Sequence, residues 1–211
     1  MPPPRFKYPR TPHLPWSPGA SADDERLVDC RNFEGRGVVV TEKMDGENTS
    51  LYSDGLHARS LDSRHHASRN WVKAWHGSMA HHIPEGWRLC GENVYARHSI
   101  AYRQLDGYFY LFSVWNAENQ CLSWQETTEW AALLECPTPA VLYEGGWDAP
   151  LLRQLTINPE MTEGYVVRLA DPFPYEAFAT SVGKWVRPRH VQTDQHWMHA
   201  PITPNQLRQD G

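Results

Sequence analysis

Short strand-like segments separated by turns constrain the fold of this chain more than any other feature of its sequence. A β-branched run covers residues 37–43, and residues 48–53 and 56–60 flank a Ser-Asp-Gly sequence that is typical of a hairpin turn. Further segments with strand-like patterns lie at residues 87–96, 107–115, 140–144, 163–169 and 181–186. The sequence therefore predicts a protein rich in short strands.

Helical patterns are fewer, and they do not alternate regularly with the strands. Aromatic and aliphatic residues recur at every fourth position from Trp71 to Ile83, which predicts an amphipathic helix within residues 67–83. A Ser-Trp-Gln-Glu sequence with capping-box spacing begins a predicted helix at residues 123–135, and residues 149–155 predict a short one. Because strands and helices do not alternate as in βαβ units, we expect an α+β fold with antiparallel sheets.

The two ends of the 211-residue chain differ in composition from its middle. Residues 1–20 are rich in proline and predict an extended amino-terminal arm, whose HLPWSPG sequence would either fold over a site or only tether the terminus. Residues 190–211 form a polar tail without periodicity. The middle, residues 21–189, is long enough for one sizeable core and is the predicted functional domain.

Composition argues against several classes of protein. No stretch approaches the roughly 18 apolar residues of a membrane span, and no apolar run follows the basic amino terminus as in a secretory signal. Four scattered cysteines without a Cys-x-x-Cys pair favour reduced thiols in the cytoplasm over disulfides or a zinc site. The net charge of −5 argues against binding nucleic acid by charge alone, although it is compatible with a local basic groove.

Lysine is rare in this chain, and one lysine stands in a distinctive setting. Lys43 ends the strand pattern of residues 37–43 and begins the sequence Lys-Met-Asp-Gly. A lysine with its usual pKa of about 10.4 is protonated at neutral pH, so a nucleophilic lysine needs burial or a neighbouring cation. Asp45 is close enough to hold a hydrated metal ion, and Gly46 permits a turn that would aim both side chains into one cleft. An ordinary strand and turn with a surface lysine would show the same four residues.

Five more segments follow this lysine in a particular order. They are an arginine at the end of a hairpin, a Gly-Glu strand, an aromatic strand, a Glu-Gly strand and a last strand with two cations, at residues 57–60, 89–92, 108–115, 163–168 and 184–187. With Lys43-Met-Asp-Gly-Glu-Asn48, these segments resemble the motifs of the covalent nucleotidyltransferase superfamily of ligases and capping enzymes, especially its RNA ligase 2-type branch. The resemblance covers residues 38–188.

This resemblance implies a fold and a reaction. The implied fold is an antiparallel-sheet nucleotidyltransferase domain, adenylyltransferase and ATP-grasp-like, with interspersed helices. The implied activity is that of an ATP-dependent, AMP-forming RNA ligase. A lysine takes AMP from ATP and passes it to a 5′-phosphate, and a 3′-hydroxyl then displaces the AMP. The implied cofactors are ATP and Mg²⁺ or Mn²⁺, and the implied partners are nicked, broken or hairpin RNA ends, as in RNA repair.

The resemblance also implies a catalytic set and a metal site. Lys43 is the implied nucleophile, Lys184 the cation on the α-phosphate, and Asp45 the third catalytic residue. A nearby Lys184 would also lower the pKa of Lys43, because like charges disfavour protonation. Glu163 and Glu92 are the implied metal ligands, and Glu92 would alternatively accept a hydrogen bond from the ribose.

The implied nucleotide contacts involve the base, the ribose and the phosphates. Glu42 would accept from the adenine amine, and Arg59 would bind the ribose and phosphate or the 5′-phosphate of the RNA. Phe112 would stack on adenine, with Tyr110 as the rival because alternation in a strand puts both on one face. The family commonly has Lys-x-Lys on the last strand, where this chain offers Arg187 as the second cation. The full set is Glu42, Lys43, Asn48, Arg59, Glu92, Phe112, Lys184 and Arg187.

Three rival functions stay open. DNA nick sealing and mRNA capping use the same chemistry, but such relatives usually carry an OB-fold domain after the last motif. Only some two dozen residues follow Arg187, so we expect no OB-fold domain and favour an RNA-end ligase, with or without a partner protein that adds RNA contacts. A catalytically silent nucleotide- or RNA-binding module is the second rival. The third is a zinc hydrolase, for which His196 and His199 offer no third ligand.

Overall fold

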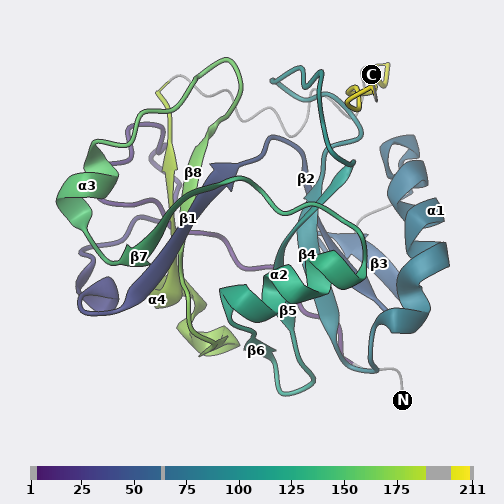
Figure 1. The fold of residues 1–211 in the computed structure, drawn as a ribbon, viewed down its shortest axis with the longest axis horizontal. Helices are drawn as coiled ribbons and strands as arrows, with labels where there is room; N and C mark the ends of the chain where they lie inside the picture. The colour runs from purple at the N-terminus through teal and green to yellow at the C-terminus, as the bar shows by residue number, and fades with distance from the viewer. Residues whose placement is uncertain (1–3, 63–64, 189–200, 210–211) are drawn as a thin grey trace.

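The computed structural model describes residues 4–62, 65–188 and 201–209, and their strands form two antiparallel sheets that lie side by side (Figure 1). The first sheet has the strand order β10 (Val182–Val186), β8 (Gly164–Leu169), β1 (Gly37–Lys43) and β7 (Val141–Gly146). The second has the order β3 (Gly55–Ala58), β2 (Glu47–Tyr52), β4 (Arg88–Asn93), β5 (Phe109–Trp115), β6 (Gln120–Cys121) and β9 (Phe173–Pro174). The chain crosses from the first sheet to the second between β1 and β2, within the Lys-Met-Asp-Gly sequence.

Helices flank the sheets, and the longest two cover the second sheet. The helix α2 (Trp124–Leu133) begins at the predicted capping box, in which the Glu126 N–H donates to Ser123 Oγ (3.2 Å) and the Ser123 N–H donates to Glu126 Oε2 (2.9 Å). The other α-helices are α1 (Asn70–Met79), α3 (Ala149–Arg153) and α4 (Phe178–Ser181), with 3₁₀ turns at Arg31–Phe33, Ala67–Arg69, Ala80–His82 and Tyr175–Ala177. Within the described residues, no helix has the length and apolar character needed to cross a bilayer.

Three clusters of buried apolar side chains form the core. Val38 of β1 packs in a cluster that includes Trp115 at the end of β5, and this cluster joins the two sheets. Val72 of α1 and Leu111 of β5 belong to the core of the second sheet. A third, smaller cluster includes Tyr110 and lies beneath the loop that follows β4. Burial of apolar surface in the first cluster therefore holds the two sheets against each other.

The predicted fold class, α+β with antiparallel sheets, is confirmed by this arrangement. The structure adds β6, β9 and α4, which the sequence did not predict because segments of two to four residues are too short to show a period. It also adds a bulge in β5. No described segment forms a separate OB-fold domain, and the two sheets account for all ten strands of the described chain.

The amino-terminal arm runs alongside the edge strand β10. The Lys184 N–H donates to the Pro12 carbonyl (2.9 Å), and the Leu14 N–H donates back to the Lys184 carbonyl (2.7 Å). Further along, the Gly19 N–H donates to the Val186 carbonyl (2.9 Å). The arm is therefore bound to the sheet by backbone hydrogen bonds, on the strand that carries one of the predicted cations.

Residues 201–209 pack against the loop that follows β4. Asn205 is buried, and its Oδ1 accepts from the Tyr102 N–H (3.0 Å) while its Nδ2 donates to the Val94 carbonyl (2.8 Å). The Arg97 N–H donates to the Thr203 carbonyl (2.8 Å) in the same region. This carboxy-terminal segment therefore holds the loop after β4, which contacts the predicted site.

Candidate active site

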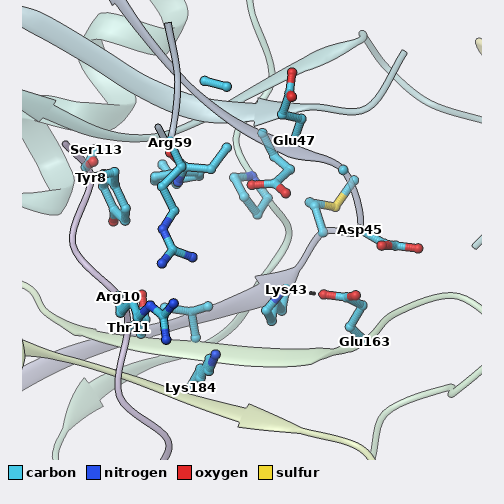
Figure 2. A pocket seen from close by; sticks show the side chains of 18 of the residues that line it. Tyr8, Arg10, Thr11, Lys43, Asp45, Glu47, Arg59, Ser113, Glu163 and Lys184 are labelled. Carbon is cyan, nitrogen blue, oxygen red and sulfur yellow. Dashed lines mark hydrogen bonds and ion pairs between the residues drawn. The ribbon is translucent and has the colours of Figure 1, made fainter. Parts of the chain in front are cut away.

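A cavity of about 1180 Å³ opens between the two sheets (Figure 2). Its walls come from the arm at residues 7–11, from the β1–β2 crossing at residues 41–48, from residues 58–60 at the end of β3, and from Lys184 of β10. Every predicted site residue lines this cavity except Arg187. The fold therefore collects, around one space, residues that are spread over most of the chain.

Lys43 is the last residue of β1, and its side chain enters the cavity. Its Nζ donates to Glu163 Oε2, and 27% of the side chain is exposed. The pairing of β1 with β8 places Lys43 opposite Gly164, which brings Glu163 beside the amine. A Cβ on Gly164 would lie 1.9 Å from the Trp185 carbonyl oxygen, so only glycine lets β10 approach this closely. Thr162 Oγ1 also donates to the Lys43 carbonyl (3.1 Å).

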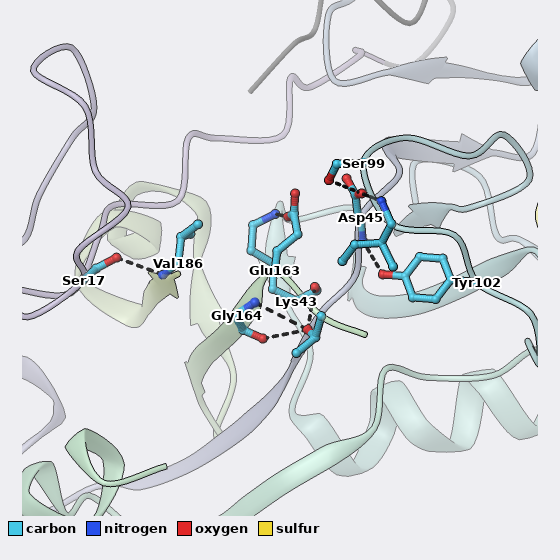
Figure 3. Close-up of polar contacts among 10 residues, drawn as sticks. Ser17, Lys43, Asp45, Ser99, Tyr102, Glu163, Gly164 and Val186 are labelled. Carbon is cyan, nitrogen blue, oxygen red and sulfur yellow. Dashed lines mark hydrogen bonds and ion pairs between the residues drawn. The ribbon is translucent and has the colours of Figure 1, made fainter. Parts of the chain in front are cut away.

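Three carboxylates, those of Glu163, Asp45 and Glu92, surround Lys43 closely enough to change its pKa. Figure 2 shows Glu163 and Asp45 on the same side of the lysine. Asp45 Oδ2 accepts from Ser99 Oγ (2.7 Å) and from the Ile100 N–H (2.7 Å), as Figure 3 shows for Ser99. These bonds fix the carboxylate on the loop after β4, so this acidic end of the cavity is held from two sides.

The acidic end controls the charge of the lysine. Burial lowers the pKa of Lys43, but the negative charges of Glu163, Glu92 and Asp45 outweigh burial and raise it. Burial raises the pKa of Glu92 to about 8, with Lys43 opposing and the other two carboxylates reinforcing the shift. Burial and then Glu163 raise the pKa of Asp45 as well. A further positive charge at this end would offset the negative charge of the carboxylates. The pKa of Lys43 would then fall, and the amine would lose its proton more readily.

The acidic end suits a divalent ion that is shared with a phosphate. No group of three or more His, Cys, Asp and Glu side chains is placed to hold a metal ion among the described residues. Mg²⁺ is commonly bound through one or two carboxylates, several waters and the phosphates of a substrate, without a closed protein cage. The Glu163 and Glu92 carboxylates fit such an open site. His196 and His199 lie outside the described residues.

Three cations lie on the opposite side of Lys43, namely Lys184 of β10, Arg59 after β3 and Arg10 of the arm (Figure 2). Burial lowers the pKa of Lys184, and Lys43 lowers it further while Asp24 opposes the shift. This end of the cavity is suited to anions. Sequence reasoning missed Arg10, because nothing in the composition of the arm indicates that it pairs with β10.

Arg187, the predicted second cation of the last strand, is not among the residues that line the cavity. It lies three positions after Lys184 and directly follows β10, which ends at Val186. Its backbone N–H donates to the Glu163 carbonyl (3.0 Å), and its Nε is buried with no hydrogen-bond partner in the described chain. The last strand thus offers the cavity a single cation.

The two aromatic candidates occupy different surroundings. The pairing of β4 with β5 shifts at Phe112, which forms a bulge, and a bulge breaks the alternation of side chains. Phe112 lines the cavity and packs edge-on against Tyr8 of the arm, with 5.3 Å between ring centroids. Tyr110 lies in the third core cluster, and its hydroxyl accepts from the Asp106 N–H (3.0 Å). Phe112 therefore forms part of the cavity wall, whereas Tyr110 lies in a core cluster and does not line the cavity.

Glu42 and Asn48 line the wall beside the lysine. Burial raises the pKa of Glu42. Asn48 Oδ1 is buried and has no hydrogen-bond partner within the described residues. Buried polar atoms are normally paired, so the amide oxygen is placed to accept a hydrogen bond from a bound molecule.

Comparison with known proteins gives one sequence family and one group of structures. A family model described as RNA ligase matches residues 36–186. No curated protein sequence matches the chain at a significant level. The structure of a Naegleria gruberi RNA ligase with PPi aligns with a TM-score of 0.55 at 19% identity, covering 87% of this chain and 61% of that chain. A mutant of that ligase with ATP and Mn aligns with a TM-score of 0.55 at 17% identity, covering 88% and 61%.

A mutant of the same ligase in its apo form aligns with a TM-score of 0.54 at 18% identity. The alignment covers 74% of this chain and 51% of that chain. The chain thus spans about half to three fifths of the solved ligases that it matches. At these identities the structural matches establish a shared fold.

Proposed function

The chain belongs to the RNA ligase family, and from that premise we propose that it is an ATP-dependent RNA ligase that joins 5′-phosphate to 3′-hydroxyl ends through a lysyl-AMP intermediate and an adenylated RNA end. The observation that carries the proposal is the position of Lys43 between the acidic end and the cations of the cavity. A lysine that attacks phosphorus needs cations on the phosphates and a way to lose its proton. This arrangement supplies candidates for both.

In the first step, Lys43 Nζ forms a bond to the α-phosphorus of ATP. The bond from that phosphorus to the oxygen that bridges the α- and β-phosphates breaks, and its electron pair leaves with pyrophosphate. The ammonium gives up one proton to solvent before the attack, and the nitrogen loses a second proton to solvent on becoming a phosphoramide. Lys184 neutralises an α-phosphate oxygen, whose charge is greatest in the transition state.

Glu163 and Glu92 are the proposed ligands of Mg²⁺ or Mn²⁺. Such an ion, when bound, neutralises the carboxylates and the charge that develops on the phosphates. Glu163 would then no longer hold the Lys43 amine by an ion pair, and the pKa of Lys43 would fall. Asp45 stays bound to Ser99 and Ile100 and keeps the acidic end in place.

Recognition of the nucleoside is assigned to the walls beside Lys43. Phe112 is the proposed stacking partner of adenine, since it lines the cavity and Tyr110 does not. Glu42 would accept a hydrogen bond from the adenine amine, which favours ATP over GTP. Asn48 and Arg59 would act in the later steps, when AMP passes to the 5′-phosphate and the 3′-hydroxyl attacks the adenylated end.

The cellular setting completes the proposal. All four cysteines are free thiols, which fits a reducing cytoplasm. The family points to RNA ends as the substrate, and we propose that a partner protein supplies further contacts to the RNA. Sealing of nicked, broken or hairpin RNA in repair is the proposed role.

Label transfer from ATP tests the chemistry directly. The protein is incubated with α-labelled ATP and Mg²⁺ or Mn²⁺ and separated on a denaturing gel. Wild type should retain label and Lys43→Ala should not. Lys73→Ala, on the outer side of α1, is the matched control and should retain label. No label on wild type in either metal, with mass spectrometry excluding a protein that is already adenylated, would contradict the proposal.

The polymer is tested with the labelled protein. Nicked, single-stranded and hairpin RNA are compared with the corresponding DNA, each with a 5′-phosphate and a 3′-hydroxyl. We expect AMP transfer and sealing with RNA. Sealing of DNA alone would move the assignment to a DNA ligase, labelling by GTP would move it to a capping enzyme, and binding without label would indicate a silent module.

A further inference from the structure

Arg10 of the amino-terminal arm enters the cavity, and no motif of the chain includes it. We infer that Arg10 forms, with Lys184, a subsite for a diphosphate, and that in the proposed ligase it binds the β- and γ-phosphates of ATP and the pyrophosphate that leaves. The inference rests on the proposed function for its place in the reaction, while the subsite itself is a property of the charges and the geometry of the cavity.

The arm is positioned firmly enough for Arg10 to be part of a built site. Two residues after Arg10, the Pro12 carbonyl accepts from the Lys184 N–H (2.9 Å). His13 and Leu14 are fully buried, and Ser17 Oγ accepts from the Val186 N–H (2.9 Å), as Figure 3 shows. Backbone pairing with β10 therefore fixes Arg10 next to the strand that carries Lys184.

The side chain of Arg10 differs from those of the arginines around it. Arg5, on the same arm, forms an ion pair with Asp54 (2.8 Å). Arg26 donates to the carbonyls of Pro15 (3.0 Å) and Ser17 (3.0 Å) and so holds the arm in its own fold. Arg10 is exposed and has no hydrogen bond or ion pair with any described residue, yet it lines the cavity. Unlike those of Arg5 and Arg26, its guanidinium is therefore available to a ligand.

The direction of a bound triphosphate follows from the charges on either side of Lys43. Glu163 and Asp45 lie on one side of the lysine and repel phosphate oxygens that are not bridged by a metal ion (Figure 2). Arg10 and Lys184 lie on the other side, where the β- and γ-phosphates find positive charge. Among the described residues, Lys184 lines the cavity and Arg187, the other predicted cation of the last strand, does not. Arg10 therefore supplies the second cation from a different segment of the chain.

A guanidinium suits this task because it presents several N–H donors in a planar fork that matches two phosphate oxygens at once. A lysine at the same position would keep the charge but lose the two-point contact. Arg10→Ala should therefore weaken diphosphate binding strongly, and Arg10→Lys should weaken it less. The exposed position of Arg10 means that neither change disturbs a packed core.

The first measurement requires no ligase activity. In a Lys43→Ala background, inorganic pyrophosphate is titrated calorimetrically into proteins that carry Arg10, Arg10→Ala, Arg10→Lys or Arg36→Ala. Arg36 is an exposed arginine outside the cavity, 4.0 Å from Asp171, and serves as the charge-matched control. Arg10→Ala should bind pyrophosphate at least about ten-fold more weakly, in line with the loss of charge-assisted hydrogen bonds. Equal binding by all four, or no binding by any, overturns the inference.

The second measurement places the subsite in the reaction. With Lys43 intact, Arg10→Ala should need at least about ten-fold more ATP for half-maximal self-adenylation, and ten-fold more pyrophosphate to discharge the labelled adduct. Sealing of RNA that is already adenylated should be unchanged. A defect confined to that sealing step would assign Arg10 to the 5′-phosphate of the RNA and overturn the diphosphate assignment. If wild type fails to label, the ligase proposal fails, and the pyrophosphate titration still decides the subsite.

Discussion

The acidic and cationic ends of the cavity are built in different ways. At the acidic end, Asp45 and Glu163 lie within two residues of β1 and β8, which pair directly so that Lys43 faces Gly164. At the cationic end, Arg10, Arg59 and Lys184 come from the arm, from a hairpin and from an edge strand. The positions of the acidic side chains therefore depend on strand pairing within one sheet. The positions of the cationic side chains depend on how three separate segments pack together.

This difference has a chemical consequence for the lysine between the ends. The acidic end holds Lys43 in its charged form, since its carboxylates raise the pKa of the amine. The cationic end attracts the phosphates that a neutral amine would attack. A ligase needs both states in sequence, so substitutions at the two ends should fail in different ways.

The largest effect is expected for Glu163→Gln at the acidic end. This change removes the ion pair with Lys43 and the proposed metal ligand while keeping the size of the side chain. Metal-dependent self-adenylation should fall about 1000-fold, which is in the range for loss of a major electrostatic contribution. Single-turnover labelling with α-labelled ATP measures the rate.

Glu160→Gln, an exposed carboxylate in the loop before β8, is the control for this change and should adenylate normally. Without metal, the pKa of Lys43 should be lower in Glu163→Gln than in wild type, because the largest charge that raises it is gone. An unchanged pKa together with normal adenylation would show that the acidic end does not control the lysine.

At the cationic end, Lys184→Ala should reduce self-adenylation about 100-fold, through loss of charge stabilisation on the α-phosphate. The backbone bonds of residue 184 to Pro12 and Leu14 do not use the side chain, so the arm should stay in place. Lys184→Arg keeps the charge and should recover part of the rate. The rate of self-adenylation is measured against pH for wild type, Lys184→Ala and Lys184→Arg. The pH dependence distinguishes loss of the positive charge on the α-phosphate from a change in the pKa of Lys43.

The anchor of the arm at this end should depend on pH. Burial, and then the positive charge of Lys184, lower the pKa of His13 to about 4, with Asp24 opposing and Arg26 and Lys43 adding to the shift. The folded protein therefore binds fewer protons than the unfolded chain between pH 6.5 and 4. Stability is retained above pH 6.5 and is lost as the pH falls towards 4, by about 2 kcal/mol at pH 4.5.

Urea unfolding of wild type and His13→Gln at pH 7.0 and 4.5 measures this loss. The glutamine variant is less stable at pH 7.0, because it loses the packing of the ring, but it should lose about 2 kcal/mol less than wild type between the two pH values. Equal losses in both proteins would mean that His13 is protonated freely in the folded state. The cationic end would then not depend on a buried neutral histidine.

The sequence predicted the acidic end better than the cationic end, for a physical reason. The strands at residues 37–43 and 163–169 have clear patterns, and their ends carry Lys43 and Glu163, so these residues could be named before their neighbours were known. The pairing of the arm with β10 is made by backbone groups, which leave no mark on residue type. Arg10 could not be named for that reason.

Two further features lay beyond the sequence. The bulge at Phe112 shifts the register of β5 against β4, and neither glycine nor proline marks the site. Residues 201–209 show no period because they pair as single bridges, yet Asn205 is buried by its bonds to the loop after β4. In both cases the structure depends on contacts between residues that are far apart in the sequence. The local pattern of residue types therefore could not predict it.

The smallest effect is expected for Ser99→Ala, which tests how rigid the acidic end must be. Ser99 Oγ donates to Asp45 Oδ2 (2.7 Å), and the Ile100 N–H donates to the same oxygen and remains in the variant. Ser99 is exposed, so water can replace the hydroxyl, and the cost should be about 1 kcal/mol or less in unfolding free energy. Ser78→Ala is the control, since Ser78 Oγ donates only to the Trp75 carbonyl of its own helix.

Self-adenylation by Ser99→Ala should fall only a few-fold, because Asp45 keeps its backbone donor and Glu163 keeps its place on β8. A loss as large as that of Glu163→Gln would mean that the orientation of Asp45 matters as much as the ion pair. The acidic end would then depend on the loop after β4 and on residues 201–209 that hold it, and it would be as much a product of distant segments as the cationic end.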